Sequence, residues 1–293
     1  MEAIVMQQIK KIGNSFWYMT PVSETDRPIL GMVVGKEKTL MIDAGNSEAH
    51  AQLFLEMLKE QNISNPDFVA LTHWHWDHIF GLPVLQNALS IAHFETKKEM
   101  NTLVSYEWSD EALDARVKEG TEIEFCADCI KKEFSEKPRN IQILPPSLTF
   151  QKQLELDLGD VTCVLEHVGG DHSHDSVVIY IKEEKILFLG DCIYADIFSA
   201  KRNYTTKRTF KLIQELEGFD AETYILSHGT AINRDEFSQE IHLLKTVGTY
   251  TETHKGDEEK IKAAYKQELD RELNEDELET ITYFVNGYEM VNL

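Results

Sequence analysis

Cysteine and positive charge are both scarce in this sequence. Only four of its 293 residues are cysteine, too few and too unevenly spaced for a disulfide framework. Lysine and arginine number 29 against 51 aspartate and glutamate residues, which gives a formal net charge of −22. Because nucleic acids and anionic membranes are bound mostly through clustered basic side chains, we expect neither as a partner.

Long hydrophobic runs are missing as well. Apolar stretches such as residues 186–189 fall far short of the roughly 20 residues that a membrane span needs. The first residues have no basic segment ahead of an apolar one, so no secretory signal is predicted and a cytoplasmic location is expected. Apolar residues still make up 42% of the chain and aromatic residues 10%. This composition predicts a folded protein with a sizeable core, as one large domain or one domain with an insertion.

Short β-like runs separated by turn residues dominate two parts of the chain. We expect strands at residues 3–9, 15–20, 29–34, 39–42 and 68–71, and again at 154–158, 161–165, 177–181, 186–189 and 223–226. Helices are expected after Asn46 and Ser47, over residues 206–217, and over most of the chain from Asp235 onward. Each part reads as strands followed by a helix. This order predicts an α/β fold with helices outside two packed sheets.

The composition changes between these two parts. Residues 106–138 are charged and contain few large apolar side chains, which predicts a helical insertion. The insertion contains Cys126 and Cys129, spaced as Cys-x2-Cys. For this pair, coincidence, half of a zinc site and a redox pair all remain open.

The densest chemical signal follows the predicted strand at residues 68–71. His73, His75, Asp77 and His78 form the pattern H-x-H-x-D-H, which random draws from this composition would produce in roughly one such chain in a thousand. Two histidines two residues apart at a strand end project to the same side and can hold one metal ion, while Asp77 and His78 can reach a second. Packed or surface histidines are the alternative. Clustered imidazoles and a carboxylate that leave a buried strand together favour a metal.

Three further candidates lie where predicted strands meet loops. His172 is in a glycine-rich loop, Asp191 follows the strand at 186–189, and His228 follows the strand at 223–226. Taken singly, each is better explained by a structural role. Four such strand ends together predict one site built on an α/β scaffold.

With these residues in this order, the sequence resembles the metallo-β-lactamase-fold hydrolases over about residues 3–245. The matching residues are Asp43, His73, His75, Asp77, His78, His172, Asp191 and His228. The resemblance implies a four-layered αββα sandwich with the metals at one edge. It also implies that residues 1–245 form the metallo-β-lactamase-like domain, with the insertion at about 106–138. Residues 246–293 are then a helical C-terminal extension that either covers the site or makes a homodimer contact.

The resemblance also assigns roles to the matching residues. His73, His75 and His172 would hold one divalent ion, and Asp77, His78 and His228 the other. Asp191 would bridge the two ions and Asp43 would support the site. Zinc suits this histidine-rich set, and iron or manganese would also fit imidazole and carboxylate ligands.

Metal-assisted hydrolysis is the reaction that this site implies. A hydroxide bridging the two ions would attack a small ester, lactone, thioester or amide, and Asp77 would carry a proton to the leaving group. A phosphodiesterase of the same superfamily acting on a small phosphodiester is the alternative, since the charge of −22 disfavours polymeric nucleic acid. A redox or non-catalytic member fits less well, because flavin-linked di-iron relatives place a carboxylate where this chain has His75.

A few neighbouring residues have two interpretations each. Tyr194 stands three residues after Asp191, a spacing seen in the N-acyl-homoserine-lactone lactonases, so it would either donate a hydrogen bond to the reacting oxygen or pack under the next helix. The basic pairs after Asp191 would receive an anionic substrate group or begin a solvated helix; they are Lys201 with Arg202 and Lys207 with Arg208. His174 would face the substrate or the solvent. Residues 106–138 are expected to select the substrate.

Overall fold

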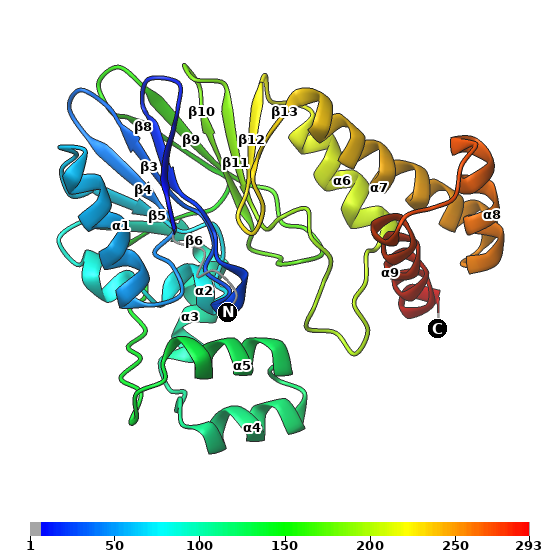
Figure 1. The fold of residues 1–293 in the computed structure, drawn as a ribbon, viewed down its shortest axis with the longest axis horizontal. Helices are drawn as coiled ribbons and strands as arrows, with labels where there is room; N and C mark the ends of the chain where they lie inside the picture. Colours follow the sequence, from blue (N-terminus) through cyan, green and yellow to red (C-terminus); the bar gives the residue numbers. More distant parts are fainter. Residues whose placement is uncertain (1–6, 293) are drawn as a thin grey trace, which may run out of the picture.

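Two β-sheets lie face to face, with helices on both outer sides (Figure 1). The computed structural model describes residues 7–292, so residues 3–6 of the first expected strand lie outside the described part. The seven-stranded sheet has the order β1 (Ile9–Ile12), β2 (Phe16–Met19), β3 (Leu30–Val34), β4 (Thr39–Ile42), β5 (Phe68–Ala70), β6 (Leu89–His93) and β7 (Leu148–Phe150). The six-stranded sheet has the order β13 (Ala231–Asn233), β12 (Thr223–Leu226), β11 (Ile186–Gly190), β10 (Val177–Ile181), β9 (Thr162–His167) and β8 (Gln153–Asp157).

The helices fall into an N-terminal set, an insertion and a C-terminal set. The first set has α1 (Glu48–Glu60), α2 (Trp76–Ile79), α3 (Phe94–Leu103) and the 3-10 turns η1 (Ser23–Thr25) and η2 (Leu82–Leu85). The insertion has α4 (Asp110–Glu119) and α5 (Glu124–Glu133). The last set has α6 (Thr206–Leu216), α7 (Arg234–His254), α8 (Glu258–Leu269) and α9 (Glu275–Asn292). Within residues 7–292, no helix combines the length and apolar character needed to cross a membrane.

The alternation of side chains along the strands explains the four layers. On β4, Leu40 and Ile42 are buried between the sheets, while Met41 faces the helices outside. On β10, Val177 and Ile179 pack between the sheets, while Val178 packs under the C-terminal helices. Because neighbouring residues of a strand point to opposite faces, each sheet needs apolar cover on both sides. The predicted αββα sandwich is confirmed.

Parallel pairing gathers several strand ends at one edge of the molecule. Strands β4, β5, β6 and β7 are parallel to one another in the first sheet, and β11 is parallel to β12 in the second. The carboxyl ends of parallel strands meet on the same side of a sheet, which is where sites of α/β proteins are usually built. The segments after β5, β11 and β12 therefore come together.

Helix α1 illustrates how local signals place these elements. Ser47 is its N-cap and its side chain accepts a hydrogen bond from the backbone N–H of His50. Ala51, Phe54 and Leu58 repeat at helical spacing and are buried against the first sheet. The expected helix start is therefore confirmed.

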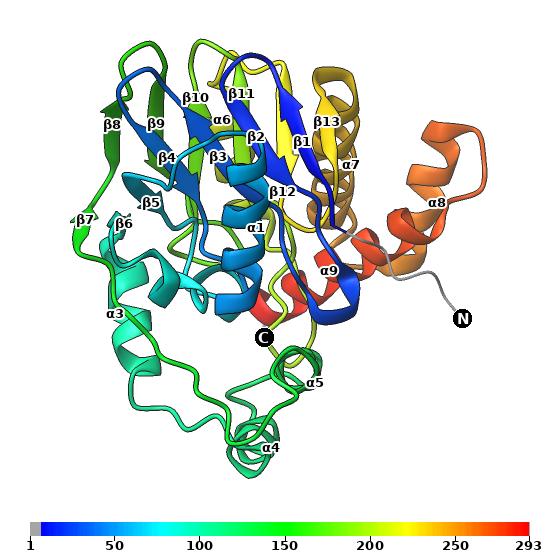
Figure 2. The ribbon, with the colours of Figure 1, turned by 60° about the vertical axis from the view of Figure 1, so that its left-hand side comes forward.

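The insertion folds as two helices below the sandwich, as expected (Figure 2). Cys126 and Cys129 lie on the buried face of α5 together with Ala127 and Ile130. Burial raises the pKa of both thiols. Neither cysteine belongs to a cluster of three or more metal-ligating side chains within the described residues. Packing against the core therefore accounts for the Cys-x2-Cys pair.

The C-terminal helices pack on the second sheet and on the loop after β11. The backbone N–H of Tyr204 donates to the carbonyl of Tyr283 on α9 at 3.0 Å. The Asn286 amide donates to the carbonyl of Arg202 at 2.8 Å. Helix α7 runs without interruption across residue 245, so no change of element marks the proposed boundary there.

Candidate active site

Seven side chains from four loops converge where the parallel strands end. His73 and His75 follow β5, and Asp77 and His78 lie on the short helix α2. His172 comes from the loop between β9 and β10, Asp191 directly follows β11, and His228 follows β12. The sequence-predicted set is thus brought together in full. That these residues bind metal stays a prediction.

The seven side chains divide into two groups. His73, His75 and His172 form the first, with His172 Nε2 at 3.0 Å from His75 Nδ1. Asp77, His78, Asp191 and His228 form the second. There, Asp77 Oδ2 lies 3.0 Å from His78 Nε2 and 3.1 Å from His228 Nε2. Each group offers converging ligand atoms for one ion.

One carboxylate oxygen lies between the two groups. Asp191 Oδ2 is 4.0 Å from His73 Nε2 and 3.4 Å from His172 Nε2 in the first group. It is 3.4 Å from His78 Nε2 and 3.3 Å from His228 Nε2 in the second. Gly190, with φ +59°, allows the close approach of this turn to Thr72, since a Cβ at residue 190 would come within 3.0 Å of the Thr72 Cβ. Asp191 is therefore placed to bridge.

Several atoms of the site are buried without a hydrogen-bond partner. They are His73 Nε2, His78 Nε2 and Asp191 Oδ1. Buried polar atoms normally have partners, because an unpaired one costs about 1–3 kcal/mol. His73 Nε2 and His78 Nε2 both lie within 4.0 Å of Asp191 Oδ2, among the other ligand atoms. The donor set therefore fits divalent metal ions well.

The two groups also differ in protonation. Burial lowers the pKa of His73, His75 and His172, so these imidazoles are neutral and offer lone pairs. Burial opposes charge in the second group too, but there the carboxylates of Asp77 and Asp191 raise the pKa of His78 and His228 above the ordinary range. The second group thus combines two carboxylates with two imidazoles that favour protonation, whereas the first group contains neutral imidazoles only.

Surrounding groups orient the imidazole rings. Asp43, at φ +60°, accepts a hydrogen bond from the backbone N–H of Thr72 at 2.7 Å and contacts His78 Nδ1 at 2.8 Å. His172 Nδ1 lies 3.1 Å from the carbonyl of Ala195. His228 Nδ1 lies 3.2 Å from Asp26 Oδ1. Such contacts fix the ring orientation and the nitrogen that faces a metal.

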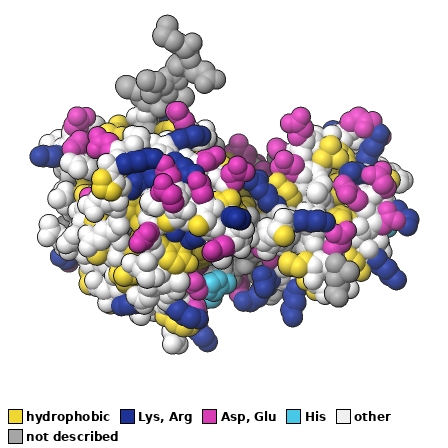
Figure 3. Space-filling view, turned by 90° about the horizontal axis from the view of Figure 1, so that it is seen from below, with side chains coloured by type: hydrophobic (Ala, Val, Ile, Leu, Met, Phe, Trp, Pro, Cys, Tyr) yellow, Lys and Arg dark blue, Asp and Glu magenta, His cyan; other side chains and the backbone are white. Residues whose placement is uncertain are grey.

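A cavity of about 420 Å³ opens onto both groups. Besides the candidate ligands it is lined by Phe125 and Cys126 of α5, by Tyr194, Arg202 and Tyr204 of the loop after β11, and by Glu279 and Tyr283 of α9. A histidine side chain reaches the surface in the hollow between the two parts of the molecule (Figure 3). The insertion and the C-terminal extension both help to form the walls.

The structure separates the other candidates near the motif. The Tyr194 ring lies beside both His172 and His228. Its centroid is 6.1 Å from that of the His172 ring and 6.4 Å from that of the His228 ring. The side chain of His174 is 57% exposed and lies near Glu99, away from the cavity. Cys192 is buried in the outer core of the second sheet. Only Tyr194 of these three faces the candidate ligands.

Sequence reasoning missed Asp26 and the particular residues of α5 and α9 that line the cavity, although it expected the insertion to select the substrate and the extension either to cover the site or to make a dimer contact. Asp26 belongs to no motif, and it comes near His228 only through the packing of the two sheets against each other. Phe125 and Tyr283 look like ordinary helix residues. No local pattern could have identified them.

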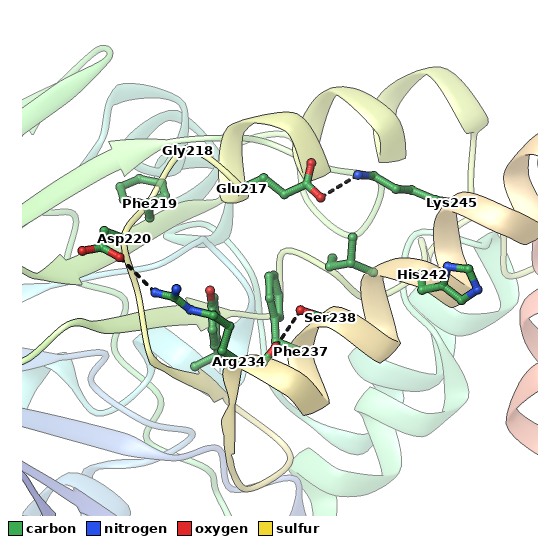
Figure 4. A pocket seen from close by; sticks show the side chains of 11 residues that line it. Glu217, Gly218, Phe219, Asp220, Arg234, Phe237, Ser238, His242 and Lys245 are labelled. Atoms are coloured by element: carbon green, nitrogen blue, oxygen red, sulfur yellow. Dashed lines mark hydrogen bonds and ion pairs between the residues drawn. The ribbon is translucent and has the colours of Figure 1, made fainter.

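A larger cavity of about 610 Å³ lies elsewhere, between the end of α6 and the start of α7 (Figure 4). Its charged side chains are already paired, Arg234 with Asp220 at 2.9 Å and Lys245 with Glu217 at 2.6 Å. Within the described residues, none of the clusters of metal-ligating side chains lies there. The smaller cavity is therefore the candidate active site.

Comparison with known proteins identifies a family and two sequence relatives. The family model described as the Metallo-beta-lactamase superfamily matches residues 27–228. The human acyl-coenzyme A thioesterase MBLAC2 is 24% identical over 205 residues, which are 66% of this chain and 69% of the relative. Its Bos taurus counterpart is 23% identical over the same shares.

Solved structures share the fold. A metallo-beta-lactamase from Pontibacter korlensis aligns with a TM-score of 0.57 and 20% identity, over 81% of this chain and 98% of that one. The sec-alkyl sulfatase PisA1, as a double mutant, aligns with a TM-score of 0.63 and 12% identity, over 85% of this chain and 42% of that one. At these identities the likeness concerns the fold alone.

Proposed function

Because this chain belongs to the metallo-beta-lactamase superfamily and is a hydrolase of that superfamily, we propose that it uses two metal ions to hydrolyse small thioesters. The position of Asp191 Oδ2 between the two ligand groups carries the two-metal part of the proposal. The similarity to an acyl-coenzyme A thioesterase favours thioesters among the ester, lactone, thioester and amide substrates that suit such a site.

The proposed ligands follow the two groups. His73, His75 and His172 would hold one ion, Asp77, His78 and His228 would hold the other, and Asp191 would contact both. Zinc is proposed because imidazoles dominate the set, and iron or manganese would also fit. When bound, the two ions supply Lewis acidity, which makes water nucleophilic near neutral pH and polarises the substrate carbonyl.

The chain's own residues hold and protonate the substrate. Asp77 uses Oδ2 to contact His78 and His228, and it also lines the cavity. We assign to it the transfer of the proton released by water to the leaving sulfur. The new bond joins the water oxygen to the carbonyl carbon, the carbon–sulfur bond breaks, and the products are a carboxylic acid and a thiol.

Tyr194 and Arg202 are assigned to binding. Burial raises the pKa of Tyr194, so its phenol keeps its proton and can donate to the carbonyl oxygen as charge develops there. Arg202 lines the cavity, and no ion pair joins it to a carboxylate of residues 7–292, whereas its neighbour Lys201 is paired with Glu289 at 3.0 Å. An unpaired guanidinium in a chain of charge −22 suits an anionic group on the substrate.

The test combines metal analysis with a substrate panel. The wild type is expected to contain two ions per chain, whereas His73→Ala and Asp191→Ala contain fewer. Thioesters with and without an anionic group are then compared with a lactone, an ester, an amide and a phosphodiester, by release of acid or thiol. Full metal occupancy in both variants would overturn the ligand assignment. Preference for the lactone or the phosphodiester would overturn the thioester assignment.

A further inference from the structure

Asp26 lies beside His228 and lines the cavity, yet it belongs to neither ligand group and to no motif. Its Oδ1 lies 3.2 Å from His228 Nδ1, on the side of the ring opposite Asp77. We propose that Asp26 is a positioning residue for His228 and that the helical insertion holds Asp26 in place. The inference rests on the metal ligands proposed above.

The first argument is an asymmetry between the two ligand groups. In the second group the outer nitrogens of both histidines face carboxylates, His78 towards Asp43 and His228 towards Asp26. In the first group the outer nitrogen of His172 faces the neutral carbonyl of Ala195. A carboxylate behind an imidazole fixes the ring and raises its basicity as a ligand. Asp26 therefore acts on the second ion rather than the first.

The second argument is that the turn carrying Asp26 is tightly held. Asp26 has φ +55° and ψ +41°, in the left-handed region, at the end of η1. The turn is closed by two backbone hydrogen bonds of 2.9 Å between Val22 and Arg27. The Asn46 amide donates to the Thr25 carbonyl at 2.7 Å. A backbone conformation that costs energy in most residues is thus maintained by its surroundings.

Two further contacts join this turn to the site and to the insertion. Just after the turn, the backbone N–H of Ile29 donates to the carbonyl of Ser227 at 2.7 Å, which ties it to the residue before His228. The Arg27 guanidinium donates to both carboxylate oxygens of Glu133 on α5, at 2.7 and 3.1 Å. The Glu133 side chain is only 4% exposed, so this bidentate pair is shielded from solvent. Contacts therefore run from α5 through the turn to His228.

Substitutions at Asp26 can separate positioning from folding. Asp26→Gly removes the carboxylate and adopts the left-handed conformation without strain. Asp26→Asn keeps an acceptor oxygen but removes the charge. Glu184→Gln is the control, because the Glu184 carboxylate accepts hydrogen bonds from Asn14 and Ser15 at a remote hairpin. All three metal-free proteins are compared by thermal unfolding.

Zinc alone is then titrated into each metal-free protein against a chromophoric chelator. For Asp26→Gly we expect the affinity for one of two ions to fall roughly 10- to 100-fold, with the other unchanged. Asp26→Asn should show a smaller loss at the same ion. Cobalt spectra should change for that ion only. A general structural defect would instead lower the affinity for both ions and lower the melting temperature of the metal-free protein.

The outcomes are distinguishable. If the wild type binds two ions and Asp26→Gly binds both with wild-type affinity, the role of Asp26 is refuted while the proposed function stands. An equal loss of affinity for both ions in Asp26→Gly also refutes the role of Asp26. If the wild type itself does not bind two ions, the ligand assignment fails and the role of Asp26 fails with it.

Discussion

Removing one oxygen atom from Tyr194 tests whether this residue acts on the substrate. The Tyr194→Phe substitution keeps the ring that packs beside His172 and His228. Burial and the nearby Asp191 raise the pKa of the phenol, against a hydrogen bond from the backbone of His228. Tyr194 lines the cavity and keeps its proton, so the phenol O–H is available to donate into the cavity.

The expected magnitude follows from that geometry. Loss of one donor to the oxygen that gains charge in the transition state lowers kcat about 100-fold, equivalent to ~2.7 kcal/mol. KM should change little, because the interaction is strongest in the transition state. Because the raised pKa keeps the phenol protonated, the fold-change in kcat should be the same at neutral and mildly alkaline pH.

The assay is steady-state thioester hydrolysis with metal content measured on the same samples. Tyr180→Phe is the matched control, because its hydroxyl donates to the carbonyl of Asp220 at 2.9 Å, away from the site. It should lose some stability and keep its kcat. Wild-type kcat in Tyr194→Phe with full metal content would refute the catalytic role and leave Tyr194 as a packing residue.

Two further predictions concern the insertion. Burial raises the pKa of Glu133, but hydrogen bonds from Arg27 and Ser47 outweigh it and lower the pKa. Glu133 therefore stabilises the fold at pH values above its pKa in the unfolded chain. This stabilisation is lost as the pH falls through the pKa of Glu133 in the folded protein. Glu133→Gln should therefore lower the urea midpoint at pH 7, and the difference in midpoint from the wild type should shrink below pH 4. A difference that does not change with pH would contradict this. Phe125 is 46% exposed and lines the cavity. Phe125→Ala should raise KM for thioesters with bulky acyl groups more than for acetyl thioesters at unchanged metal content, and an unchanged substrate profile would mean that the insertion is scaffold.

Point substitutions suit the insertion better than its deletion. Helix α5 contributes Cys126, Ala127, Cys129 and Ile130 to the outer core of the first sheet. Its removal would expose that core and also release Arg27. The substrate-selecting role of residues 106–138 is therefore tested at the cavity wall.

Several elements were predictable and others were not. Strands β4, β10 and β12 have the predicted bounds, because each is an apolar run ended by turn residues. Strands β6, β7 and β13 and helix α3 were missed. The two shortest of these strands have three residues each, and α3 is largely polar, so neither periodicity nor composition marks them. Their conformation depends on pairing with distant segments.

The sequence by itself determined the order of the layers and the candidate ligands. Apolar runs bounded by turn residues predicted strands followed by helices, and the H-x-H-x-D-H spacing placed His73 and His75 at a strand end. These are local properties, encoded within a few neighbouring residues. The tertiary structure decided which distant groups meet around them. It brought Asp26 to His228 and placed Phe125 and Tyr283 in the cavity walls, because such contacts arise from the packing of sheets and helices between segments far apart in the chain.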